Sequence, residues 1–263
     1  MLATANAFVS LGLKDLGYIY VNSDDCWANE SRNSSGYLVP NPSKWPNGIQ
    51  AVTNELHSMG LKFGLYGDAG RETCGGYPGS QGHEAQDADT IASWGVDYWK
   101  YDNCYTGTGF NNAGANTTTY YPTMTNALAN SGREILFSMC QWGRDYVWTW
   151  AADVGNSWRM SGDIQNNWAS VASIAAFAAT ISQWAAPGGF NDLDMMVCDS
   201  SYFITRMLTY IATWERRFDC GRRTSPFWAL GHCEISYYYG NGYDEDSFLD
   251  SGGHKKPSKS RLR

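Results

Sequence analysis

The side chains best suited to chemistry in this sequence are aspartates that follow the ends of predicted strands. Two basic residues, Lys100 and Arg159, lie among them, and the aspartates are Asp24, Asp25, Asp68, Asp102, Asp163, Asp192 and Asp194. If the strands are parallel, their carboxyl ends meet on one face, so we expect these side chains to lie close together.

Three explanations compete for this group of carboxylates. Asp is common in turns, so some of them cap loops, an explanation that suits Asp68 and Asp192. A metal site would use clustered oxygens, but no loop has the EF-hand spacing and no His accompanies the carboxylates. Glycoside hydrolysis needs two carboxyl groups that face each other across a sugar, with aromatic and hydroxyl-binding groups around them. A set that combines pairs of Asp residues with Trp, one Lys and one Arg suits that chemistry best.

The stretch Asp97–Cys104 is the strongest single signal, because a strand rich in aromatic residues ends there in charged ones. Alternation places Lys100 and Asp102 on one face of the strand and Trp99 and Tyr101 on the other. The plain alternative is a Lys–Asp ion pair that ends an ordinary strand, since burying an unpaired charge is costly.

Strand and helix patterns alternate along the chain. Strands are predicted at 18–22, 61–66, 96–102, 135–139 and 155–159 and a sixth at about 190, with helices at 4–16, 49–59, 83–94, 120–130 and 168–184. The helix at 168–184 is rich in small apolar residues, so we expect it to be buried on most sides. Polar residues where each strand ends favour a (β/α)8 barrel. An open doubly wound sheet is the competitor, but the sequence lacks its Gly-rich phosphate loop.

Composition excludes several classes of partner. The 263 residues carry a net charge of −7 and 15% aromatic residues, which fits an enzyme with stacking surfaces better than a disordered or nucleic-acid-binding chain. No apolar run approaches the roughly 20 residues that span a bilayer, and no signal peptide is recognisable. The charge changes along the chain: residues 1–196 hold 9 Lys and Arg against 18 Asp and Glu, whereas residues 197–263 hold 10 against 8.

The cysteines and the N-glycosylation sequons indicate whether the protein binds a metal and whether it is secreted. The seven cysteines include no C-x-x-C pair and no His at zinc-ligand spacing, so we expect neither a metal nor a cofactor. Three sequons, at Asn29, Asn33 and Asn116, would permit N-glycosylation in a secreted protein.

Four motifs in order resemble glycoside hydrolase family 27, the retaining α-galactosidases (melibiases) and α-N-acetylgalactosaminidases, and look most like the fungal α-galactosidases. The resemblance covers about residues 6–196. The motifs are Asn22-Ser-Asp24-Asp25-Cys-Trp27, Lys100-Tyr-Asp102-Asn-Cys104, Ser157-Trp-Arg159-Met-Ser-Gly-Asp163 and Gly189-Phe-Asn-Asp-Leu-Asp194-Met195.

The resemblance implies a role for each matching residue. Asp102 would be the nucleophile and Asp163 the general acid/base, about 5 Å apart as in retaining enzymes. Lys100, next to Asp102, would favour the ionised nucleophile, whereas Asp163 needs a raised pKa. The implied substrate-binding residues are Asp24, Asp25, Tyr66, Lys100, Cys140, Trp142, Arg159 and Met195.

The family pattern also implies specificity and a disulfide. Cys140 and Trp142 would surround the 2-substituent of the sugar, leaving room for a hydroxyl but not for an acetamido group, so galactose is favoured over N-acetylgalactosamine. Cys74 and Cys104 would form a disulfide beside Asp102. The substrate would be an α-galactoside oligosaccharide or polysaccharide such as melibiose or galactomannan.

The sequence departs from the family at both ends. Residues 1–196 are expected to form a barrel without its first strand, and residues 197–263 a divergent, possibly frameshifted segment with a disordered basic tail from about 250. No eighth strand or C-terminal β-sandwich is recognisable. Missing strands leave open edges, so an alternative to the active enzyme is an inactive remnant that at most binds galactose.

Overall fold

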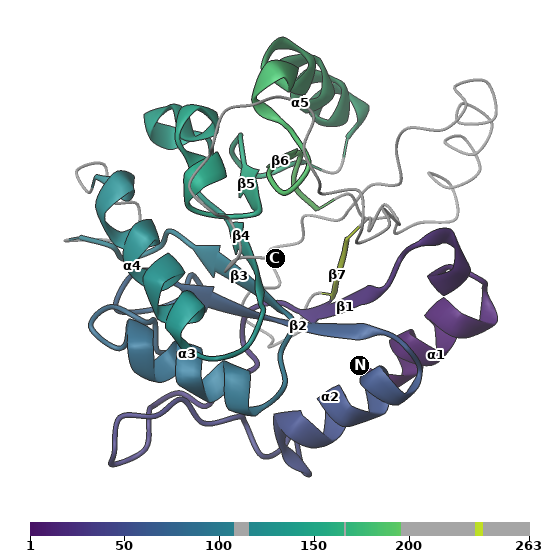
Figure 1. Cartoon of the computed structure of the whole chain (residues 1–263), viewed down its shortest axis with the longest axis vertical. Helices are drawn as coiled ribbons and strands as arrows, with labels where there is room; N and C mark the ends of the chain where they lie inside the picture. The colour runs from purple at the N-terminus through teal and green to yellow at the C-terminus, as the bar shows by residue number, and fades with distance from the viewer. Residues whose placement is uncertain (108–115, 166, 196–234, 239–263) are drawn as a thin grey trace, which may run out of the picture.

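Six parallel strands form part of a barrel wall in the computed structural model, which describes residues 1–107, 116–165, 167–195 and 235–238 (Figure 1). The strands are β1 (Tyr20–Ser23), β2 (Lys62–Asp68), β3 (Tyr98–Asp102), β4 (Leu136–Met139), β5 (Ser157–Arg159) and β6 (Phe190–Asp192). They lie side by side in chain order, and each pairs in parallel with the next. The predicted alternation of strands and helices, and an incomplete (β/α)8 barrel, are thus confirmed.

Helices connect the strands along the outer side of the sheet (Figure 1). They are α1 (Leu2–Ser10), α2 (Gly48–Ser58), α3 (Glu84–Ser93), α4 (Thr117–Asn130) and α5 (Trp168–Thr180), with short 3-10 turns η1 (Lys14–Leu16), η2 (Arg144–Thr149), η3 (Ala151–Asp153) and η4 (Ser182–Trp184). Helix α2 ends where predicted, because Gly60 adopts a φ of +71° that a side chain would disfavour. Its residues Ile49 and Leu56 are buried against the sheet.

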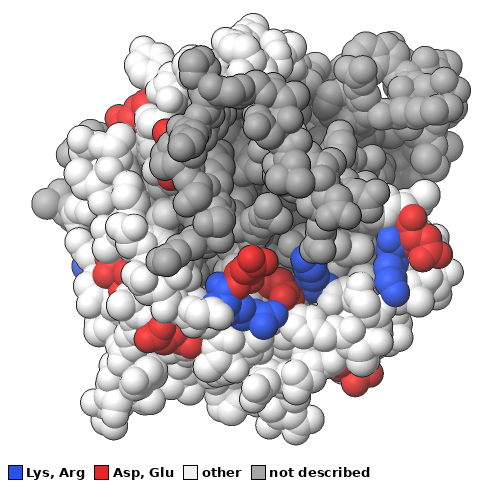
Figure 2. Space-filling model, in the orientation of Figure 1, with Lys and Arg blue, Asp and Glu red and all other residues white. Residues whose placement is uncertain are grey.

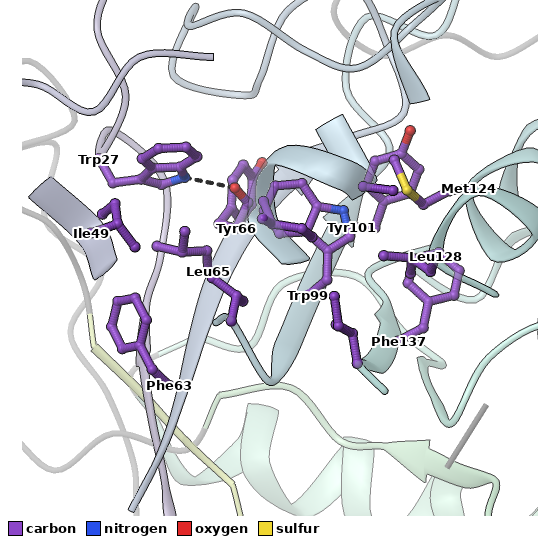
Figure 3. Close-up of a cluster of buried hydrophobic side chains, with 14 of the residues drawn as sticks. Trp27, Ile49, Phe63, Leu65, Tyr66, Trp99, Tyr101, Met124, Leu128 and Phe137 are labelled. Atoms are coloured by element: carbon purple, nitrogen blue, oxygen red, sulfur yellow. Dashed lines mark hydrogen bonds between the residues drawn. The ribbon is translucent and has the colours of Figure 1, made fainter. Parts of the chain in front are cut away.

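Strand β3 alternates as predicted. Trp99 and Tyr101 belong to the buried apolar cluster between sheet and helices (Figure 3). The Tyr101 ring lies 5.9 Å from that of Tyr121 in α4. Lys100 and Asp102 lie on the other face, where they meet polar side chains of neighbouring strands. The outer face of β3 therefore anchors the strand, and the inner face is available for chemistry.

The expectation that the last predicted helix is buried on most sides is wrong. In α5 only Val171 and Ile174 are buried, whereas Trp168 is 57% exposed and Trp184 of η4 is 42% exposed. The helix is rich in Ala, so its sequence is apolar all round without forming a wide stripe of large side chains. It packs on a small separate cluster that includes Met160 and Ile164.

One edge expected to be open is covered. Strand β7 (Ile235–Tyr238) pairs antiparallel with the outer edge of β1, in the register Tyr20 to Tyr238 through Ser23 to Ile235. The open edge predicted beside β1 is therefore wrong. The remaining predictions for residues 197–263, including the disordered tail, lie outside the described residues.

The described surface offers two observations about partners. No helix in this part of the chain is both long and apolar enough to cross a membrane. On the face shown in Figure 2, Lys and Arg side chains lie next to Asp and Glu side chains instead of forming a separate basic surface.

Candidate active site

Asp102 occupies the end of β3 and is held by neutral donors from three directions. The Tyr66 hydroxyl of β2 donates to Asp102 Oδ2 at 2.9 Å, and the Trp142 indole N–H donates to Oδ1 at 2.9 Å. The backbone N–H of Asn103 also donates to Oδ1 at 2.9 Å. With 6% exposure, the carboxylate is buried and fixed in orientation.

The electrostatic environment of Asp102 differs in part from the sequence expectation. Burial raises the pKa of Asp102 above its ordinary value, and Lys100, Arg159 and the Tyr66 hydrogen bond oppose that rise. Lys100 therefore favours the ionised form, as predicted, but burial outweighs it. Burial also raises the pKa of Tyr66 well above its ordinary value, so its hydroxyl stays protonated and continues to donate.

Lys100 forms its ion pair with Asp24, and not with Asp102 at the end of its own strand. Its Nζ lies 2.6 Å from Oδ2 of Asp24, directly after β1, and 5.2 Å from the centre of the Tyr66 ring. Met195 Sδ is 4.0 Å from the same nitrogen. Burial alone would lower the pKa of Lys100, but Asp24 and Asp102 raise it, so the pKa stands well above its ordinary value.

Asp25 joins the loop after β1 to the loop after β2. Its Oδ1 accepts the backbone N–H of Cys26 at 2.6 Å, and its Oδ2 accepts that of Gly75 at 2.7 Å. Burial raises the pKa of Asp25 to about 6, against these two hydrogen bonds. Cys26 adopts a φ of +67°, so the chain turns sharply directly after the two aspartates.

Arg159, at the end of β5, connects the second half of the site. It forms an ion pair with Asp163, and its Nη1 lies 3.2 Å from Cys140 Sγ. Arg159 is buried, whereas the Asp163 side chain is 71% exposed. Asp102 is thus enclosed and Asp163 open to solvent, two environments that suit different roles.

Asp194 is a supporting residue to which sequence reasoning assigned no role. Its Oδ2 accepts the backbone N–H of Ile164 at 2.8 Å, next to Asp163, and its Oδ1 lies 3.7 Å from Arg159 Nη1. Asp194 has a φ of +77°, which is uncommon outside glycine. Its place in the Asn-Asp-Leu-Asp motif after a strand was the available signal, but the pairing with the Ile164 backbone was not readable from spacing.

The disulfide Cys74–Cys104 is present, as the family resemblance implied. Cys74 Sγ lies 3.4 Å from Asp102 Oδ2 and 3.2 Å from the Tyr66 hydroxyl oxygen. Ligand atoms of Asp68, Cys74, Asp102 and Cys104 all lie within 4.8 Å of one another, a spacing that would suit a metal ion. The two sulfurs are joined to each other, so they do not act as thiolate ligands, and two carboxylates alone do not make a zinc site.

Direct contacts join nine of the ten predicted catalytic and binding residues into two groups. Asp102 contacts Tyr66 and Trp142, and Lys100 contacts Asp24, Met195 and the Tyr66 ring. Arg159 contacts Asp163 and Cys140, whereas Asp25, next to Asp24 in the chain, accepts backbone N–H groups of two loops. The three sequon asparagines lie elsewhere: Asn29 is partly exposed, and Asn33 and Asn116 are exposed. Asn116 Oδ1 also accepts the N–H of Thr118 and so caps α4.

Comparisons of sequence extend the motif evidence. Residues 1–215 match the family model described as alpha galactosidase A. The α-galactosidase of Cyamopsis tetragonoloba is 53% identical over 194 residues, which are 73% of this chain and 46% of that protein. The α-galactosidase of Lachancea cidri is 44% identical over 220 residues, which cover 74% of this chain and 46% of the yeast protein.

Solved structures give the same picture. The Saccharomyces cerevisiae α-galactosidase, determined with raffinose, superposes with a TM-score of 0.71 at 38% identity, covering 77% of this chain and 50% of that one. α-Galactosidase I from Mortierella vinacea gives a TM-score of 0.69 at 42% identity, covering 73% and 53%. The chain therefore spans about half the length of the curated relatives and solved structures that it matches.

Proposed function

The chain belongs to the alpha galactosidase A family, and we propose that it acts as a retaining glycosidase that releases terminal α-linked D-galactose. The observation that carries this proposal is the Asp102 carboxylate. It is buried, oriented by Tyr66 and Trp142, and accompanied by Lys100 and Arg159. Such a group can attack a carbon held in front of it without leaving its position.

The proposed reaction has two displacements. One Asp102 oxygen bonds to the anomeric carbon while the glycosidic bond breaks, and Asp163 gives a proton to the departing oxygen. Asp163 then takes a proton from water, and that water replaces Asp102 on the sugar. The exposed position of Asp163 suits both steps, since it can meet the leaving group and water in turn. The proposed separation of the two carboxyl groups is about 5 Å.

The remaining residues would bind the sugar. Asp24 and Asp25 would accept hydrogen bonds from the 4- and 6-hydroxyls of galactose, and Lys100 would hold ring hydroxyls beside them. Arg159 would face the 2- and 3-hydroxyls, with Tyr66 and Met195 lining the pocket. The ion pair between Lys100 and Asp24 supports this assignment, because it orients both groups before a sugar arrives.

The sugar preference rests on Cys140 and Trp142. Trp142 is tied to Asp102 and Cys140 contacts Arg159, so both flank the side where we place the 2-hydroxyl. We propose that an acetamido group does not fit there. An assay with matched p-nitrophenyl α-galactoside and α-N-acetylgalactosaminide tests this preference, and faster hydrolysis of the second substrate would overturn it.

Activity itself is tested with raffinose and melibiose. We expect the 263-residue chain to release galactose from both, and Asp102→Asn to abolish release. Proton NMR of the first product should show the α-anomer, as double displacement requires. Galactose binding without any release in the unaltered chain would instead support the non-catalytic remnant.

We also propose secretion and glycosylation. The Cys74–Cys104 disulfide supports an oxidising compartment, and exposed Asn33 and Asn116 are accessible to a transferase. A fall in apparent mass after treatment with an N-glycosidase, lost in Asn33→Gln or Asn116→Gln, is the expected result from a secreting host.

A further inference from the structure

Four side chains of the types that bind metal ions meet beside the nucleophile proposed above. One ligand atom from each lies within 4.8 Å of the other three, and the four residues are Asp68, Cys74, Asp102 and Cys104. Asp68 and Asp102 are register partners at the ends of β2 and β3, and the two cysteines belong to the loops that follow these strands. Two sulfurs with two carboxyl groups form a donor set that suits zinc once the sulfurs are thiolates.

The separations of the donor atoms match those around a tetrahedral zinc ion. Its bond lengths place sulfur and oxygen donors about 3.5 Å apart. Cys74 Sγ lies 3.4 Å from Asp102 Oδ2 and 3.8 Å from Asp68 Oδ2. The Cα atoms of Cys74 and Cys104 are 5.2 Å apart, so rotation of the side chains can separate the two sulfurs while the backbone stays in place.

Neighbouring groups already hold both carboxyl groups in position. Asp68 Oδ1 accepts the backbone N–H of Gly70 at 2.7 Å, and its Oδ2 accepts that of Cys104 at 3.0 Å, in agreement with its predicted role as a loop cap. The Tyr66 hydroxyl donates to Asp102 Oδ2 at 2.9 Å. Hydrogen bonds of this kind orient the ligands of metal sites, so two of the four ligands are pre-arranged.

The disulfide decides whether this donor set can bind a metal ion. The thiolate is the form of cysteine that binds metals, and the sulfurs of Cys74 and Cys104 are bonded to each other. We propose that reduction of this disulfide turns the four side chains into a zinc site. On the glycosidase function proposed above, zinc at this site captures the nucleophile Asp102 and stops catalysis. The disulfide therefore keeps metal ions away from a carboxyl group that has to stay reactive.

The steps balance with a phosphine as the reductant. The phosphine gives two electrons to the disulfide and takes the oxygen of one water molecule, whose two protons complete the thiols. Zn²⁺ then replaces the thiol protons, and any proton that a carboxyl group carries, and these protons pass to solvent. Burial raises the pKa of both Asp68 and Asp102, but the site needs no ionised carboxyl group before the metal ion arrives.

Access to the cluster is through Cys74. This residue is partly exposed, whereas Asp68 and Cys104 are completely buried. A reductant therefore meets the disulfide at Cys74 Sγ, and a metal ion enters from the same side. Two thiolates favour zinc over calcium or magnesium, which prefer sites made only of oxygen donors.

Cobalt binding tests the site without turnover. Co²⁺ substitutes for zinc at such ligands, and charge transfer from thiolate to cobalt gives an absorption band in the near ultraviolet. After reduction and removal of the phosphine, we expect the 263-residue chain to gain this band and to lose it when zinc is added. The chain with its disulfide intact should not gain it. The absence of a gain overturns the proposal, and so does loss of the native circular dichroism on reduction, since the site depends on the fold.

Variants assign the band to the four side chains. The double variant Cys74→Ser, Cys104→Ser should gain no band after reduction, and Asp68→Asn should bind cobalt at least about tenfold more weakly. Cys26→Ser is the matched control, because Cys26 is also a buried cysteine but is not among the four side chains. Its band should equal that of the unaltered chain. A band in the double variant, or its loss in Cys26→Ser, would place the metal at other cysteines and overturn the proposal. If Asp68→Asn does not fold, the double variant still decides.

Zinc inhibition separates this proposal from the proposed function. With p-nitrophenyl α-galactoside as substrate, we expect zinc to lower kcat of the reduced chain at least about tenfold, and a chelator to restore it. The chain with its disulfide intact should keep its activity at the same zinc concentration, and equal inhibition of both forms would contradict the proposal. If neither form hydrolyses the galactoside, the proposed function fails, whereas the cobalt spectra still decide whether the metal site exists.

Discussion

Asp97 directly precedes β3 and Asp102 is its last residue, and their surroundings show how the two ends of the barrel differ. Asp97 has two direct side-chain partners: the Arg133 guanidinium, whose Nη2 lies 2.6 Å from Oδ1, and the His57 ring, whose Nε2 lies 2.7 Å from Oδ2. Phe63 adds a backbone N–H at 2.8 Å. The Asp97 carboxylate thus has three partners, which lie in α2, in β2 and in the loop before β4.

Asp102 has the opposite arrangement. Its direct partners are neutral donors, while Lys100 is ion-paired with Asp24 and Arg159 with Asp163. The cations act on Asp102 at a distance, and no Lys or Arg of the described residues forms an ion pair with its oxygens. The comparison teaches that one strand uses the same side chain for stability at its amino end and for reactivity at its carboxyl end.

Asp102→Asn is the sharpest way to break this comparison. We expect kcat to fall by at least roughly 10³-fold, since a nucleophile is removed, while the melting temperature stays equal or rises. A rise is expected because the variant no longer buries a charge whose pKa is raised. Initial rates on p-nitrophenyl α-galactoside and a thermal melt provide both readouts. A large loss of stability would place Asp102 with Asp97 as a structural residue.

The second prediction is that Asp25 makes the free energy of unfolding depend on pH. Its pKa is about 6 when folded and 3.8 in the reference state, so the folded chain retains this proton where the unfolded chain has lost it. The protonated form therefore stabilises the fold below about pH 4, and this contribution is lost as pH rises through about 6. The full effect is on the order of 3 kcal/mol.

Urea midpoints at pH 4, 5, 6 and 7 for the unaltered chain and Asp25→Asn measure this effect. The difference between the two proteins should shift in favour of the unaltered chain as pH falls. A difference that is independent of pH would mean that Asp25 is ionised throughout the range.

The sequence predicts those features of the site that depend on local patterns, and misses those that depend on contacts between distant residues. The alternation in β3 was readable because Trp99 and Tyr101 must be buried while Lys100 and Asp102 cannot share that face. The family motifs added the roles and the Cys74–Cys104 pairing. The partner of Lys100 was not readable, because Asp24 lies 76 positions away and meets it only when β1 and β3 flank β2.

Other features escaped sequence reasoning for physical reasons. The burial of α5 was overestimated because Ala raises mean hydropathy without requiring burial, and only Val171 and Ile174 give the helix a buried side. The net rise in the pKa of Asp102 depends on enclosure by three neighbouring elements, which no local pattern encodes. Strand β7 was not predicted, because no helix precedes it in the described residues and the strand–helix alternation therefore gives no signal for it.

The third prediction addresses the amino end of β3. Asp97→Asn keeps an acceptor for the Phe63 N–H but loses the ion pair with Arg133 and the carboxylate contact with His57. Because both partners are about one third exposed, we expect a loss of only about 1–2 kcal/mol in the free energy of unfolding. Urea denaturation measures the loss, and kcat should stay within about twofold. A deeper fall in kcat would show that the two ends of β3 are coupled.

The smallest expected effect compares the inner and outer faces of the sheet. Tyr66→Phe removes one neutral donor from Asp102 Oδ2, whereas Tyr121→Phe removes a 3.3 Å hydrogen bond to the Tyr101 carbonyl oxygen on the helix side. The Tyr66 hydrogen bond lowers the pKa of Asp102, so its loss should move the acid limb of kcat/KM to higher pH. We expect about a tenfold fall in kcat/KM, since Asp102 is then less ionised and less well oriented.

Tyr121→Phe should cost about 1 kcal/mol of stability and leave the acid limb in place. If both variants moved the limb equally, the orientation of Asp102 would depend on the packing of the whole sheet, and the neutral donors would have no separate role.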